Sequence, residues 1–307
     1  MKQPYTKPAL TLDQKIANLR LKGMIIFDEA EAKRCLQHIS YYRLSAYWLP
    51  FEHPKNQHNS GKCFRSGTDF GTVVALHTFD RTLRRLVTEA IEEIEISVCG
   101  NWAYCMAMLG DGFSYLDPSN YADTERFESN RERLAKDVAE SKETFVQHFR
   151  DKYLDELPPV WMTSEILSFG SLSHWYANLK HPPIRQAIAE PYGLDETVFR
   201  PFLHHLSVVR NICAHHSRLW NRVFKVRLKL PSKQPKNLAT SLNPSEPQKI
   251  YNTLTMLVFV LGAINDATVW RKKLMEHIAT LPCGDVEHMG FPLDWCERPI
   301  WNQGNLA

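Results

Sequence analysis

The chain has 307 residues, of which 44% are hydrophobic and 23% charged. This composition is typical of a packed globular protein and excludes a disordered or fibrous chain. The net charge of +3 is too small to indicate a dedicated DNA-binding module, so contact with nucleic acid would depend on local patches. The seven cysteines form no CxxC pair and predict neither a disulfide framework nor a zinc ribbon.

Two helix starts and an aromatic segment mark the first fifty residues. Thr11 with Gln14, and Asp28 with Glu31, have the spacing at which a side-chain oxygen caps the first free amides of a helix. The segment 39–48 is rich in tyrosine and tryptophan. Core packing is favoured for these aromatic residues, although stacking on unpaired bases remains an alternative. A loop is expected over 53–67 because the segment is polar and rich in turn-forming residues.

A long amphipathic helix is predicted from Thr72 to beyond Ile94, where apolar residues recur at three- and four-residue steps. Its outer face is first basic, through Arg81, Arg84 and Arg85, and then acidic. We interpret that face as solvated helix surface.

The middle of the chain predicts a connection over 111–123 and one charged, exposed helix over 125–150. Helical periodicity resumes over 161–175 and again within about 198–222. Strict alternation over 224–230 favours an extended segment with its basic residues on one side.

The last part of the chain predicts a proline-rich loop over 231–247 and a core helix through 250–264. The apolar run 256–264 is well short of the roughly 20 residues that cross a bilayer. The N-terminus lacks a signal-peptide core, so we expect a cytoplasmic protein that does not engage a membrane. Length permits one domain or two. We expect a single helical domain over 1–307 with an irregular tail over 281–307.

The segment 208–222 contains the residues best suited to chemistry. On a helix with about 100° per residue, Asn211, His215, Arg218 and Arg222 share one polar sector, and Arg210 lies on its flank. An imidazole exchanges protons near neutral pH, and guanidinium groups bind phosphate through paired donors. These groups suit RNA transesterification. The alternative is a helix-packing histidine surrounded by surface arginines.

The pattern Arg210-Asn211-x-x-x-His215 resembles the catalytic motif of HEPN ribonucleases, and its surroundings extend the resemblance. The sequence from Arg210 to Arg222 is similar to the signature of the Abi-like family of bacterial abortive-infection proteins, the AbiD and AbiF group. The segments 39–48, 90–96 and 168–173 resemble other blocks of that family in the same order. The resemblance spans roughly residues 10–230.

The resemblance implies an all-α fold, a HEPN-like helical bundle with additional N-terminal helices. It also implies a toxin-like, metal-independent endoribonuclease of antiviral defence, with two motifs paired across a homodimer. The catalytic residues would be Arg210, Asn211 and His215. Related sequences are expected to carry an arginine where this chain has Cys99-Gly100. Some members are associated with a structured noncoding RNA, so the resemblance also implies regulation by RNA.

Basic residues around the motif are candidates for binding RNA. The polar sector contributes two arginines, and the extended segment contributes three further cations that could contact phosphate beside the site; these residues are Arg218, Arg222, Lys225, Arg227 and Lys229. A solvated strand face is the alternative for the last three.

Three function classes remain open: a ribonuclease, a noncatalytic RNA-binding regulator or antitoxin-like protein, and a metal hydrolase. A metal site would have to come from His204-His205 with His215-His216, or from Cys283, His288 and Cys296. Neither set has a known ligand spacing, and no carboxylate falls between residues 199 and 223. We therefore expect no metal and no cofactor, and the complete motif favours the enzyme.

Overall fold

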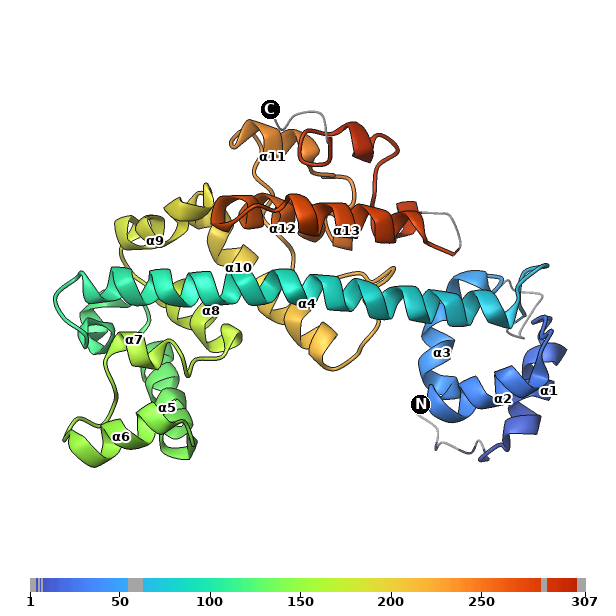
Figure 1. Cartoon of the computed structure of the whole chain (residues 1–307), viewed down its shortest axis with the longest axis horizontal. Coiled ribbons are helices and arrows are strands. Elements are labelled where there is room, and N and C mark those ends of the chain that lie inside the picture. The colour runs from blue at the N-terminus through green and yellow to red at the C-terminus, as the bar shows by residue number, and fades with distance from the viewer. Residues whose placement is uncertain (1–3, 5, 7, 55–62, 283–285, 303–307) are drawn as a thin grey trace. The chain divides into compact units, whose positions relative to one another are not determined.

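The computed structural model describes residues 4, 6, 8–54, 63–282 and 286–302 (Figure 1). In these ranges the regular secondary structure is helical, with isolated bridges and no β-strand. The predicted all-α class is confirmed. The chain divides into two compact units, Met1–Leu83 with His277–Asp285, and Arg84–Glu276 with Val286–Ala307. None of the described helices is long and apolar enough to cross a membrane.

The first unit is built from short capped helices and the start of a long one. Its helices are α1 (Leu12–Leu21), α2 (Glu29–His38), α3 (Tyr41–Trp48) and the beginning of α4 (Phe70–Ala107). Thr11 and Gln14 form the predicted capping box, and Asp28 accepts a hydrogen bond from the Glu31 amide. Both predicted helix starts are confirmed, as is the long amphipathic helix.

The aromatic segment mostly packs in the core of this unit. Tyr47 and Trp48 are buried, and the Tyr47 hydroxyl lies 2.7 Å from a carboxylate oxygen of the buried Asp80. Tyr42 is exposed. Core packing is therefore correct for Tyr47 and Trp48. Residues 55–62 of the predicted loop lie outside the described residues.

The second unit contains the remaining helices. These are the rest of α4, then α5 (Thr124–Glu140), α6 (Thr144–Lys152), α7 (Val160–Thr163), α8 (Phe169–Asn178), α9 (Pro182–Ala189), α10 (Glu196–Ala214), α11 (Lys236–Ser241), α12 (Ile250–Ile264) and most of α13 (Thr268–Ala279). Helix α10 packs against α8 and α9, and α5 packs against α8. The predicted core helix is confirmed as α12, most of whose residues are buried.

The predictions for two segments were wrong in detail. The single helix expected over 125–150 is two helices, because Ser141 has extended backbone and Arg150 donates hydrogen bonds to the Ala139 and Ser141 carbonyls. The loop expected over 231–247 contains α11. The extended segment expected over 224–230 forms neither helix nor strand and bends at residues 225 and 226. Helix α13, which separates α12 from the tail, was not anticipated.

The tail has little regular structure but is packed. Its only described helical turns are η5 (Val286–Met289) and η6 (Trp295–Glu297). Trp301 is fully buried, its ring centroid is 6.0 Å from that of Tyr251, and its indole N–H donates to Thr255 Oγ1 at 3.2 Å. The tail therefore completes the core around α12.

Candidate functional site

Helix α10 carries the Arg-Asn-x-x-x-His motif. It begins at Glu196, after Asp195 accepts a hydrogen bond from the Thr197 amide. One face is buried through Phe199, Phe202, Leu206, Val209 and Cys213. The opposite face is exposed or half-buried through Thr197, Arg200, His204, Val208 and Asn211. The amphipathic pattern thus directs the polar face of the motif to solvent.

The helix ends at Ala214, and His215 is its C-terminal cap. The Ser217 amide donates to the Ile212 carbonyl, and the His216 amide donates to the Cys213 carbonyl. These two bonds form a Schellman motif, which requires left-handed backbone at the residue directly after the C-terminal cap. His216 supplies it with φ = 55°. His215 therefore stands exposed where α10 stops.

This helix end corrects the prediction for the two following arginines. Arg218 and Arg222 lie beyond α10, in a turn-rich segment, so they do not extend its polar sector. The Arg222 guanidinium donates to the Arg218 carbonyl at 2.9 Å. The prediction of a continuous motif helix to residue 222 was wrong, because the Schellman turn redirects the backbone after His216.

Arg84 from α4 holds the turn that follows the motif. It is 6% exposed, and its Nη1 donates to the Ser217 carbonyl at 3.4 Å. The interpretation of this part of α4 as solvated surface is therefore wrong for Arg84. A buried guanidinium that bonds to a backbone carbonyl fixes where the chain turns after His215.

The three side chains of the motif differ in their exposure to solvent. Arg210 is half-buried, whereas Asn211 and His215 are exposed. Among the described residues, no hydrogen bond or ion pair involves the side chain of any of the three. The exposed side chains of Asn211 and His215 are therefore open to solvent, where a phosphodiester could meet them.

A carboxylate from another helix approaches Arg210. Burial raises the pKa of Glu95 on α4, while the Arg210 guanidinium and then the Phe169 amide lower it in part. Glu95 lies on a different helix from the motif, so the lack of carboxylates between residues 199 and 223 does not reveal it. The sequence signal for Glu95 is its position between the apolar residues Ile94 and Val98, both of which are buried. This position places a charged residue at the edge of the core face of α4.

Cys99 and Gly100 occupy the place where related sequences are expected to carry an arginine. Cys99 is buried, and that burial, with the Glu95 and Glu165 carboxylates, raises the pKa of its thiol to about 12. Gly100 is exposed, and a Cβ built there meets no atom within 4 Å. This part of α4 thus brings no positive charge near Glu95, although a larger residue would fit at position 100.

The segment 224–230 runs back along α10, away from His215. The Val226 carbonyl accepts a hydrogen bond from His205 Nδ1 at 2.9 Å, and Lys229 Nζ donates to Thr197 Oγ1 at 2.6 Å. Thr197 is about 27 Å from His215 along the helix, at roughly 1.5 Å per residue. Lys229 therefore lies at the far end of α10, not beside the motif as expected. Lys225 and Arg227 are exposed on the same segment.

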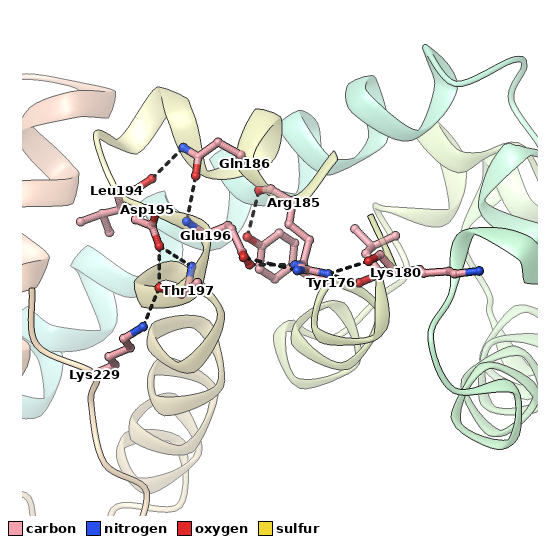
Figure 2. A network of polar contacts seen from close by, with 10 residues as sticks. Tyr176, Lys180, Arg185, Gln186, Leu194, Asp195, Glu196, Thr197 and Lys229 are labelled. Carbon is pink, nitrogen blue, oxygen red and sulfur yellow. Dashed lines mark hydrogen bonds and ion pairs between the residues drawn. The ribbon is translucent and has the colours of Figure 1, made fainter. Parts of the chain in front are cut away.

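A polar network fixes this N-terminal end of α10 (Figure 2). Arg185 Nε lies 2.7 Å from Glu196 Oε2, and each of these side chains is 13% exposed. The Tyr176 hydroxyl donates to the Arg185 carbonyl at 3.0 Å. Gln186 Oε1 accepts from the Glu196 amide at 2.9 Å. The network joins α8, α9 and α10 and so fixes the direction of the motif helix.

His205 is a core histidine, which makes unfolding pH-dependent. It is 2% exposed, and Thr253 Oγ1 lies 2.8 Å from its Nε2. Burial lowers the pKa of His205 from 6.5 to about 4. Because the unfolded chain binds the proton more tightly, this group should reduce the free energy of unfolding by about 3 kcal/mol as pH falls from about 6.5 to about 4.

Urea unfolding of the wild type and His205→Gln at pH 7.5 and 4.5 measures this effect. The stability difference between the two proteins should shrink at pH 4.5, since the variant does not titrate there. An equal difference at both pH values would contradict the assignment.

The metal alternatives gain no support from the geometry. His205 has both ring nitrogens engaged in the core, and Cys283 lies outside the described residues. Across the described ranges, no group of three or more histidine, cysteine, aspartate or glutamate side chains is arranged to hold a metal ion.

The fold and the site define an all-helical protein with an exposed Arg-Asn-x-x-x-His motif at the end of one helix. A family model described as Abi-like protein matches residues 34–221, more than half of the 307 residues. The chain belongs to the Abi-like protein family. Membership supports a general role in abortive infection, a defence against phage. Comparison with curated proteins and with solved structures finds no match in either set.

Proposed function

We propose that this protein is a HEPN-type endoribonuclease that cleaves RNA by metal-independent transesterification during abortive infection. The observation that carries the proposal is the end of α10, where Asn211 and His215 are exposed beside the half-buried Arg210 and the three side chains form no hydrogen bond or ion pair among the described residues. Regulation by a structured noncoding RNA belongs to the same proposal.

The chemistry follows from the groups at the motif. The substrate's own 2′-hydroxyl lies beside the scissile phosphate and would act as an intramolecular nucleophile. Its oxygen attacks phosphorus, the bond to the 5′-oxygen breaks, and a 2′,3′-cyclic phosphate forms. His215, or its copy in a partner subunit, would take the proton from the 2′-hydroxyl or give one to the leaving 5′-oxygen. Arg210 would offset the charge on the phosphate, and Asn211 would orient the imidazole.

Incubation of the pure protein with total RNA, with and without a chelator, tests the proposal. Cleavage in both conditions supports the ribonuclease. Binding without cleavage in either condition supports the noncatalytic regulator instead. Cleavage that stops in chelator and returns with magnesium supports a metal hydrolase.

We expect the active species to be a homodimer in which two motif helices face each other. One chain contains one copy of the motif, with one arginine and one histidine. Cleavage requires two proton transfers and the binding of a phosphate, so two copies of the motif suit the reaction better than one. Light scattering at the assay concentration measures the mass. An active species with the mass of one chain would defeat this expectation.

Joint replacement of Lys225, Arg227 and Lys229 by alanine should weaken RNA binding and flatten its salt dependence by up to about 2 units of slope, at about 0.7 per lost contact. Sequence preference should hardly change, because phosphate contacts do not read bases. Fluorescence anisotropy across a salt series measures the slope. Lys229 bonds to Thr197 at the far end of α10. The triple variant should therefore still cleave very short RNA that does not reach Lys229. An unaltered slope would count against the segment.

A further inference from the structure

A second set of basic side chains lies on α5, α8 and α10, where α8 packs against both of the other helices. His174 on α8 and His204 on α10 have ring centroids 5.9 Å apart. His174 is exposed and His204 half-buried, so the rings meet at the surface. Arg126 and Arg133 on α5 are exposed and close enough to act on His174. Arg200 is exposed one turn before His204.

The electrostatic surroundings of His174 are positive. Partial desolvation lowers the pKa of His174, and His204, Arg133 and Arg126 lower it further. The charged groups that act on this ring, on α10 and on α5, are therefore all cationic. Arg126 also pairs with Asp123 at 3.1 Å, but 75% of its side chain is exposed. Positive charge that disfavours protonation of His174 also attracts an anion, so this surface is suited to binding one.

The same face of α10 continues to the motif. His204 and Asn211 are seven residues apart, which returns them to nearly the same side of a helix. Val208 lies between them and is half-buried. From Arg200 to His215 the helix covers about 22 Å. An extended chain of phosphates laid along α10 would therefore meet Arg200 and His204 before the scissile group reaches His215.

We infer that these five residues, Arg126, Arg133, His174, Arg200 and His204, form an RNA-binding face that holds the phosphate backbone on one side of the cleavage site. The inference rests on the proposed function, since RNA is the substrate of the motif. It assigns phosphate contacts that the basic segment 225–229 does not supply, because they come from α5, α8 and the middle of α10.

The test measures binding separately from cleavage. The probe is a fluorescein-labelled single-stranded RNA with 2′-O-methyl groups, which lacks the nucleophile and stays intact. Arg133→Gln with Arg200→Gln should weaken binding about tenfold at low salt and reduce the salt slope by about 1.4, at about 0.7 per contact. The matched control is Lys272→Gln with Lys273→Gln, which removes two exposed charges from α13 and should bind like wild type.

A second variant tests the histidines. Phosphate between the rings would favour their protonated forms, so wild-type affinity should rise severalfold from pH 7.5 to pH 5.5. His174→Gln with His204→Gln should lose most of that gain. A salt slope equal to wild type in the arginine variant, or a pH response unchanged in the histidine variant, would overturn the RNA-binding face. Failure of wild-type protein to cleave unmodified RNA would overturn the ribonuclease alone, because the slopes are measured on RNA that is not cut.

Discussion

Replacement of His215 by alanine is expected to reduce RNA cleavage by about 10²- to 10⁴-fold, the range that general acid–base catalysis typically contributes. The fold should be unaffected, since His215 is exposed and the substitution keeps its backbone amide, which donates to the Asn211 carbonyl. Much of the RNA affinity should remain, because phosphate binding relies on the arginines. Single-turnover cleavage at saturating protein separates the chemical step from binding.

The adjacent histidine offers a matched control. His216 is also exposed, and it adopts the left-handed backbone at the helix end. His216→Asn keeps a residue that tolerates this conformation and removes one imidazole. It should cleave within about threefold of wild type. Equal losses in the two variants would show that the site depends on the helix end as a whole and not on the His215 imidazole.

Replacement of Arg210 by alanine should lower the cleavage rate by about 10²- to 10³-fold, the effect typical of losing one group that stabilises transition-state charge. Some RNA affinity should be lost as well, since the same guanidinium binds the ground-state phosphate. Arg210→Lys should recover part of the binding but little of the rate, because an ammonium lacks the paired donors. A variant with unchanged rate would remove Arg210 from the mechanism.

Substitution of Glu95 provides a second test of the role of Arg210. The Glu95 carboxylate acts on Arg210 from α4 and would hold the guanidinium in place. Glu95→Gln keeps the size of the side chain but removes the negative charge. We expect RNA to bind a few-fold more tightly while cleavage falls about tenfold, because a freed arginine attracts phosphate but is less well placed. A parallel change in both quantities would indicate a merely structural role.

Patterns within one segment predicted the local structure well. The capping residues Thr11 and Asp28 begin helices as expected, and the three- and four-residue periodicity places α4, α10 and α12. These signals are short-range, because caps and amphipathic faces depend on neighbours within about one or two turns.

Structural features that depend on contacts between distant segments were not predicted from the sequence. Periodicity continues past Ala214 as far as Arg222, yet the helix stops because His216 turns the backbone and Arg84 holds the Ser217 carbonyl. The approach of Glu95 to Arg210 and the pairing of Lys229 with Thr197 likewise join residues far apart in the chain. Spacing along a single helix contains no information about such contacts.

The termini of the cleavage products provide the most direct test of the central claim. Wild-type protein is incubated in chelator with a defined RNA, and the products are mapped with enzymes that distinguish their end groups. Attack by the 2′-hydroxyl predicts 2′,3′-cyclic phosphates and 5′-hydroxyls, with no cutting of DNA or of 2′-O-methyl RNA. Products with 5′-phosphates, or cleavage that requires magnesium, would contradict the mechanism assigned to Arg210, Asn211 and His215.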